Sequence, residues 1–416
     1  MAKKEEINYS ALKQMWDWLC SKYEFRRDVI KGRILWRDAL KPGKPNDKDF
    51  EVLTDEKLNT ISIEAGFSGL KSSTASNITL FLFSHYTEEI NPVADYLKRV
   101  AKRRPVDAIK KLCGYIQTHD NKMFEKHLRK WLASSIANAL IPKGCQNHTC
   151  LTLTGGQGAG KTTLFKWFCP PELSDYMYNG EIDLRSKDTL WKLAEYWIIN
   201  LEEQIKSLNR QDSNTMKQII TLPDVKGRKP YGRLEAIGYR LANFLAGSND
   251  DDFLNDPTGS RRFPSFKVVK IDEAYNKMKI DDIWAEAYHY YEQNPTSYYV
   301  TAEDFDELQK NNEQFVHVTQ EAEYISNFIA HPKENMPYYL LPATALRDYM
   351  RFETGNQGLK ERAIGIALKT NGFEQLSHRF TGADIPAKVW KVRVIAGKNI
   401  GTLDKYHAFA NNQYKP

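Results

Sequence analysis

A glycine-rich stretch between two apolar segments constrains this chain more than any other feature: LTLT, then GGQGAGKTT, then LFKWF. Residues 155–162 fit the pattern G-x-x-x-x-G-K-[ST], which connects a strand to a helix. Glycines let such a loop fold tightly, so that its backbone N–H groups point at phosphate oxygens beside the positive end of the helix. A glycine-rich turn that fits by chance is the alternative, and the flanking segments disfavour it. The sequence therefore predicts a strand, a phosphate-binding loop and a helix, in that order.

Two side chains of this loop have expected roles of their own. Lys161 is expected to neutralise the β- and γ-phosphates of a nucleotide, and the Thr162 hydroxyl is expected to bind Mg²⁺. ATP and Mg²⁺ are therefore the predicted cofactors. The residues predicted to bind the nucleotide are Gly155, Gly156, Gln157, Gly158, Ala159, Gly160, Lys161, Thr162 and Thr163.

An acidic pair follows a second apolar run, in YWIINLEEQ. Hydrolysis needs a carboxylate for the metal and another that orients the attacking water. We assign the metal role to Glu202 and the base role to Glu203, because ligands meet a parallel sheet at the ends of its strands. The alternative is an acidic pair that opens a solvated helix. The acidic pair stands about forty residues after the phosphate loop, and this position favours the catalytic interpretation.

Two further segments complete a candidate hydrolysis site. LANFLAGSND places Asn249 after a third apolar run, where an amide can contact the γ-phosphate or hold water without adding negative charge. DPTGSRRFPSF then carries Arg261 and Arg262 before a new strand. Paired arginines are usually surface salt-bridge partners. Here we interpret one of them as an arginine finger that stabilises the charge of the transition state.

The layout along the chain predicts an α/β fold in three parts. Residues 1–140 are expected to be mainly helical, with a small hairpin in FRRDVIKGRILWR. Residues 141–295 alternate short apolar runs with helical segments, which indicates a parallel sheet flanked by helices. Residues 296–416 combine short helices with the strand-like VWKVRVIAG, a pattern that suits a winged-helix module.

Composition excludes several classes of protein. Hydrophobic residues make up 41% and charged residues 27% of the 416, which is typical of globular proteins. No apolar run is long enough to cross a membrane, and MAKKEEINYS lacks the apolar stretch of a secretion signal. The expected location is therefore the cytoplasm. The net charge of +6 does not identify a nucleic-acid partner by itself.

The motifs occur in an order that resembles the virulence-associated protein E family, a branch of superfamily 3 helicases from phages and mobile elements. The resemblance rests on GGQGAGKTT, WIINLEEQ, MKQIITLPDVKGRKPYGR and YRLANFLAGSNDDDFLNDPTGSRRF. It implies an AAA+-type core in a ring, expected to be a hexamer, in which Arg261 or Arg262 acts on the nucleotide of the next subunit. Family members commonly have an acid where Asn200 stands, which leaves the metal role to Glu202.

The resemblance also implies a hairpin that faces the central pore of the ring, here LPDVKGRKPYGR. Positive charge on a turn suits a loop that follows a DNA backbone, and an aromatic ring can stack on bases. A solvated turn is the alternative. The residues predicted to bind DNA are Lys226, Arg228, Lys229 and Tyr231.

These expectations lead to two functional hypotheses. The first is an ATP-dependent, ring-forming DNA helicase or replication motor, which binds a single strand in its pore and contacts replication proteins. The second is a nucleotide-switched regulatory ATPase that binds DNA or protein without unwinding anything.

Overall fold

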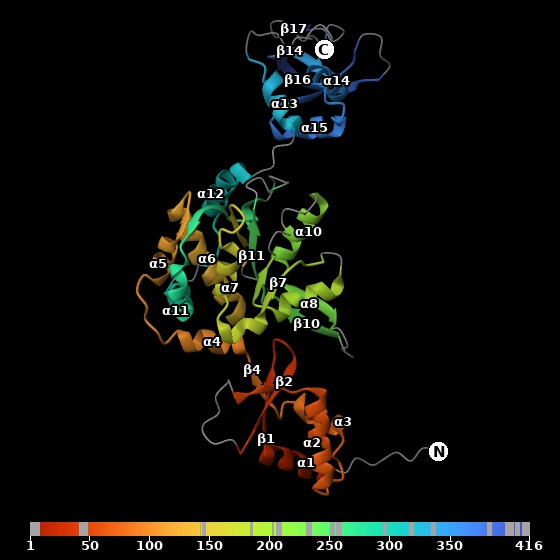
Figure 1. Cartoon of the computed structure of the whole chain (residues 1–416). Coiled ribbons are helices and arrows are strands. Elements are labelled where there is room, and N and C mark those ends of the chain that lie inside the picture. Colours follow the sequence, from red (N-terminus) through yellow and green to blue (C-terminus); the bar gives the residue numbers. More distant parts are fainter. Residues whose placement is uncertain are drawn as a thin grey trace, which may run out of the picture. The chain divides into compact units, whose positions relative to one another are not determined.

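The computed structural model describes residues 9–40, 49–141, 143, 147–183, 186–201, 204, 210–229, 235–249, 254, 260–293, 298–315, 320–333, 338–380, 385–395, 403 and 408–409. Two compact units form, Met1–Val316 and His317–Pro416. Figure 1 draws both units.

A six-stranded sheet forms the centre of the first unit (Figure 1). Its strands run parallel except at one edge, where β5 pairs antiparallel with β12. The order across the sheet is β5 (Ile116–Thr118), β12 (Ser265–Ile271), β6 (Cys150–Thr154), β11 (Asn243–Ser248), β8 (Ile198–Asn200) and β7 (Met177–Asn179).

Helices cover both faces of this sheet, because its central strands are apolar on both sides. Leu245 of β11 packs into one hydrophobic cluster, and its neighbours Phe244 and Ala246 pack into the other. The first cluster includes residues of α4 (Pro92–Val100), α5 (Ala108–Tyr115), α6 (Asn121–Leu140), α7 (Lys161–Phe168) and α11 (Ile280–Gln293). The second includes residues of α8 (Lys187–Glu195) and α10 (Arg210–Thr221). The predicted parallel sheet with flanking helices is thereby confirmed.

The first ninety residues add a small sheet with helices. Its order is β3 (Glu51–Val52), β2 (Arg33–Asp38), β1 (Tyr23–Asp28) and β4 (Glu88–Ile90). The predicted hairpin is confirmed as β1 and β2, with Gly32 at φ 64° in the turn. The helices here are α1 (Tyr9–Lys22), α2 (Asp55–Phe67) and α3 (Ala75–Leu82).

The sequence-based boundary at residue 140 crosses a continuous core. Helix α6 begins after Asp120, whose side chain accepts from Met123 N, and it packs against the central sheet. Its Trp131 Nε1 donates to Phe244 O of β11 at 3.0 Å. The large hydrophobic cluster of the first unit therefore contains residues from both sides of that boundary.

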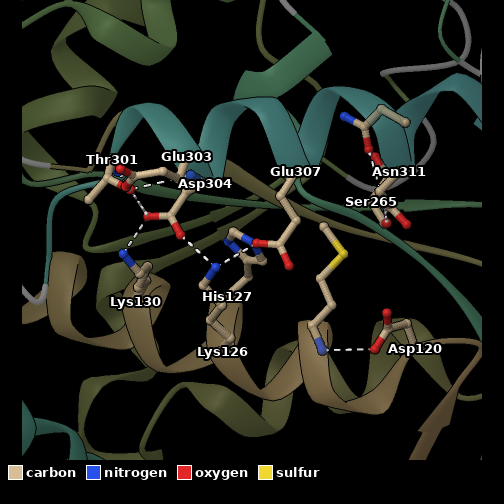
Figure 2. A network of polar contacts seen from close by, with 12 residues as sticks. Asp120, Lys126, His127, Lys130, Ser265, Thr301, Glu303, Asp304, Glu307 and Asn311 are labelled. Atoms are coloured by element: carbon tan, nitrogen blue, oxygen red, sulfur yellow. Dashed lines mark hydrogen bonds and ion pairs between the residues drawn. The ribbon is translucent and has the colours of Figure 1, made fainter.

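Helix α12 (Ala302–Asn312) also belongs to the first unit. Lys126 Nζ on α6 contacts Asp304 Oδ1 at 2.8 Å, and Lys130 contacts the other carboxylate oxygen (Figure 2). His127, Asp304 and Glu307 bring potential metal-ligand atoms within 4.8 Å of one another. The Lys126 ammonium already bridges the two carboxylates, so we interpret the cluster as an ion-pair network that holds α12 on α6.

The second unit combines three helices with a sheet. Chain order is α13 (Gln320–Phe328), β13 (Ile329–Ala330), β14 (Tyr338–Leu341), α14 (Ala343–Thr354), α15 (Glu361–Thr370), β15 (Gln375–His378), β16 (Ala387–Val394) and β17 (Ala408–Phe409). Strand β16 corresponds to the predicted strand at VWKVRVIAG and pairs antiparallel with β13, β14 and β15.

Candidate nucleotide site and its surroundings

The glycine-rich loop leaves the sheet at the end of β6 and enters α7 at Lys161. Gly155, Gly158 and Gly160 have φ values of 148°, 80° and 83°, which L side chains rarely adopt. A Cβ on Gly155 would lie 3.2 Å from Val268 O of the neighbouring strand β12. Backbone conformation therefore favours glycine at all three positions, as the sequence pattern predicted, and limited space favours it at Gly155 as well.

The Lys161 side chain lies under this loop and is only 7% exposed. Its Nζ donates to Gly155 O at 2.6 Å, to Gly156 O at 3.1 Å and to Asn249 Oδ1 at 3.1 Å. Thr162 and Thr163 follow in the first turn of α7 and are exposed. The structure thus brings Lys161 and Asn249 together at the edge of the sheet.

Asn249 reaches this position because β11 lies directly beside β6. Ser248 pairs with Thr154, and Gly155 N donates to Ser248 O at 3.2 Å. The chain therefore leaves both strands at the same level. Sequence spacing predicted a polar group at each strand end, and the parallel register explains why the two meet.

Strand β8, which precedes the acidic pair, lies one strand further away. Glu202 and Glu203 themselves lie outside the described residues. On one side of them, Leu201 N donates to Leu245 O at 2.9 Å. On the other side, the buried Gln204 amide exchanges two hydrogen bonds with the backbone of Ile182. Asn200, the last residue of β8, is level with Leu151 of β6 and lies two strand spacings, roughly 10 Å, across the sheet from it.

Two amides at this edge were not among the predicted site residues. Asn200 ends β8, is fully buried, and its Nδ2 donates to Asn179 Oδ1 at the end of β7, 3.2 Å away. The signal in the sequence is a polar residue closing an apolar run, WIIN. A neutral amide here joins β8 to β7.

Arg261 and Arg262 lie at the opposite edge of the sheet. They form a short 3-10 helix before β12, whose first residue, Ser265, pairs with Thr152 of β6, three strand residues or roughly 10 Å before the level of Gly155. The Arg261 guanidinium lies 4.7 Å from the Phe305 ring centre on α12. Burial, and then the charge of Arg261, lower the pKa of Arg262. Neither arginine is brought together with the phosphate loop of its own chain.

The predicted basic hairpin is present as β9 (Asp224–Arg228) and β10 (Glu235–Tyr239). It packs on α8 so closely that a Cβ on Gly238 would lie 2.7 Å from the Trp191 ring. Lys226 and Arg228 are exposed, whereas Lys229 is half-buried over Trp191 with its ammonium 3.9 Å from a Glu195 carboxylate oxygen. Tyr231 lies outside the described residues. The basic set therefore divides into two exposed cations and one that is bound to α8.

Among the described residues, no helix is long and apolar enough to span a membrane.

Fold and site together define a class: an α/β protein in which a glycine-rich loop follows a central strand of a parallel sheet. Residues 97–317 match the model of the virulence-associated protein E-like domain, just over half of the chain. The chain belongs to this family, as its motifs predicted.

The chain is also similar in fold to the apo structure of the NrS-1 C-terminal region (residues 305–718). The TM-score is 0.51 at 13% identity, over 94% of this chain and 100% of that chain. An A-form apo structure of the same region gives a TM-score of 0.46 at 13% identity, over 92% and 99%. No curated protein gives a significant match.

Proposed function

We propose that this chain is an ATP-dependent, ring-forming DNA helicase or replication motor with an AAA+-type core. The observation that carries the proposal is the contact of Lys161 with Gly155, Gly156 and Asn249. It puts a buried ammonium, two carbonyl oxygens of a glycine-rich loop that opens a helix, and a polar side chain from the next strand around one point. Such a set recognises a nucleotide triphosphate.

Hydrolysis is assigned to side chains around that point. The Thr162 hydroxyl and Glu202 would hold Mg²⁺, which neutralises charge on the phosphates when bound. Glu203 is the proposed base and Asn249 the proposed contact for the γ-phosphate or the water. One intervening strand, β11, separates β6, which leads to Lys161, from β8, which leads to the acidic pair, by two strand spacings or roughly 10 Å.

A second copy of the chain is part of the proposal. Arg261 and Arg262 lie just before β12, at the edge of the sheet opposite their own phosphate loop. This position suits a role at the nucleotide of a neighbouring subunit. Helix α12 holds the segment that follows the arginines, because Asn312 Nδ2 donates to Phe263 O and Asn311 Nδ2 donates to Ser265 O. A ring, proposed as a hexamer, repeats this contact at every interface.

DNA contact is assigned to the hairpin of β9 and β10. Lys226 and Arg228 present positive charge to solvent, which a DNA backbone can neutralise. Family membership supports the proposed role in DNA replication, and the likeness to the NrS-1 region supports the fold alone.

The test is phosphate release with and without single-stranded DNA, together with a strand-displacement assay. Lys161→Ala removes the buried ammonium and is expected to lower turnover by about 10² or more, since its charge stabilises the transferring phosphoryl group. Lys98→Ala, an exposed lysine on α4, is the matched control and should be unaffected. Wild-type turnover in Lys161→Ala would contradict the proposed site.

The hairpin is tested in the same assays with Lys226→Ala/Arg228→Ala. We expect its basal phosphate release to stay near wild type, while the stimulation by single-stranded DNA and the unwinding are lost. Unchanged unwinding would exclude the hairpin as the DNA contact. If wild-type hydrolysis ignores DNA altogether, the nucleotide-switched regulator replaces the motor.

A further inference from the structure

The second unit contains a rigid helix-turn-helix. Helices α14 and α15 are joined by residues 355–360, and the turn begins with Gly355 at φ 73°. Arg351 Nη2 donates to Leu359 O at 2.6 Å, which fixes the turn from inside. Buried residues of both helices share one core, including Leu346, Met350, Ile364 and Leu368. Figure 1 shows α13, α14 and α15 in this unit.

One side of α15 has no partner among the described residues of this unit. Arg362 and Lys369 are exposed, and Ile366 between them is 42% exposed. These positions are four and three residues apart, so they form a single stripe on the helix, opposite Ile364 and Leu368. We call Arg362, Gly365, Ile366 and Lys369 the α15 stripe. Neither of its two cations forms an ion pair with a described residue.

Gly365 is the unusual member of the stripe. A glycine inside a helix costs about 1 kcal/mol relative to alanine. Packing does not require it, because a Cβ at this position would meet nothing within 4 Å. Its φ also lies outside the positive range, so an alanine would fit the backbone. A bare backbone at the centre of an exposed basic stripe allows another molecule to approach the helix closely.

Charge identifies the class of that molecule. The last hundred residues contain thirteen basic and nine acidic side chains, so this unit carries +4 of the chain's +6. After α15 the chain forms the antiparallel hairpin of β15 and β16, where the exposed Lys388 stands opposite Ser377. The positive charge suits an acidic partner, and the exposed helix suits a partner with a groove wide enough to admit it. The major groove of duplex DNA has both properties.

We propose that the C-terminal unit binds duplex DNA by placing the α15 stripe in the major groove, with the β15–β16 hairpin as a wing against the backbone. The second helix of a helix-turn-helix is the one that enters the groove. Arg362 and Lys369 contact phosphates or guanine edges, Ile366 contacts thymine methyl groups, and Gly365 permits the close approach. This duplex site is separate from the nucleotide site and from the β9–β10 hairpin.

The experiment measures fluorescence anisotropy of a labelled duplex of about three helical turns, with the full chain and without nucleotide. Arg362→Ala/Lys369→Ala is expected to bind about ten-fold more weakly or worse, with a salt slope shallower by about two. Lys310→Ala/Lys333→Ala removes two exposed lysines elsewhere and is the charge-matched control. A loss no greater than that of the control, or no loss at all, would overturn the proposal.

Gly365→Ala separates close approach from charge. The variant should melt at the wild-type temperature or above, because alanine favours a helix, and it should still bind the duplex several-fold more weakly. Wild-type affinity in this variant would overturn the groove geometry. Equal affinity for a double-stranded RNA of the same sequence would also overturn it, since the deep, narrow major groove of RNA excludes a helix.

The outcome is independent of the proposed motor. Lys161→Ala, which removes the nucleotide site, should bind the duplex like wild type. A protein that binds duplex through α15 but never hydrolyses ATP would disprove the motor and leave this proposal standing. A protein that hydrolyses ATP but shows no dependence on α15 would do the reverse.

Discussion

At the scale of single residues, the candidate site contains positions that favour glycine. Gly155 is the clearest, since L side chains rarely adopt its φ of 148° and a Cβ 3.2 Å from Val268 O would require the neighbouring strand to shift slightly. Gly156 next to it has neither constraint: its φ is outside the positive range and a Cβ would meet nothing within 4 Å. The same added methyl group should therefore be destabilising at Gly155 and nearly neutral at Gly156.

We predict that Gly155→Ala lowers the free energy of unfolding by about 1–3 kcal/mol, because alanine must adopt a strained conformation or displace β12. Gly156→Ala should change it by less than about 0.5 kcal/mol. Calorimetric melting without nucleotide measures both, so the result does not depend on any activity. Equal melting temperatures of the two variants would show that the loop relaxes and that the strain is not real.

Residue types and spacing singled out Lys161 and Asn249 as candidate site residues but did not predict their contact. The sequence indicated Lys161 and Asn249 separately, 88 positions apart. Their contact at 3.1 Å follows from the pairing of β6 with β11, which no local pattern encodes. The amides of Asn179 and Asn200 escaped prediction for a related reason. Each one looks like an ordinary strand end until the parallel register places them side by side.

At the scale of elements, helices were easier to predict than short strands. Asn91 and Asp120 each cap a helix with a side-chain oxygen, and both are residue types that favour the start of a helix. Strands of two or three residues, such as β3 and β4, show no alternation that a sequence could reveal. The position of α12 was also hidden, because it depends on ion pairs with α6 from residues 174 to 181 positions away.

The ion-pair network between α6 and α12 should make the stability of the first unit depend on pH. His127 is buried among Lys126, Lys130, Asp304 and Glu307 (Figure 2), and burial lowers its pKa to about 4 although the two carboxylates raise it. Its pKa in the unfolded chain is about 6.5. Below that value the unfolded state binds a proton that the folded state does not. Stability contributed by the neutral imidazole is therefore lost as the pH falls from about 6.5 to about 4, by up to roughly 3 kcal/mol.

His127→Asn should flatten this part of the stability curve, since it removes the titrating ring. His119→Asn, which removes an exposed imidazole, is the control. Calorimetric melting of both variants between pH 4 and 7 gives the comparison. Parallel curves of stability against pH for wild type and His127→Asn would exclude the buried neutral histidine.

Asp304 contributes to stability in a different pH range. Burial alone would raise its pKa, but the bonds from Lys126 and Lys130 lower it, so its contribution is lost only at more acidic pH.

At the scale of the whole molecule, the proposal gives one chain halves of two different catalytic sites. The phosphate loop with Asn249 lies at one edge of the sheet, and Arg261 with Arg262 precede β12, which begins at the other edge. Sequence order could not reveal this separation, because the arginines follow Asn249 by only a dozen residues. Strand direction decides it: β11 ends at the loop edge, whereas β12 begins at the far edge.

This division predicts complementation between two inactive variants. Lys161→Ala retains working arginines, and Arg261→Ala/Arg262→Ala retains a working loop. In rings mixed from equal amounts, about a quarter of the interfaces join a good loop to good arginines, so phosphate release should return to a comparable fraction of wild type. Mixing Lys161→Ala with Asn249→Ala is the control, because both lesions fall on the same side of every interface and no intact site can form. A mixture that stays as inactive as this control would mean that the arginines do not act across a subunit boundary.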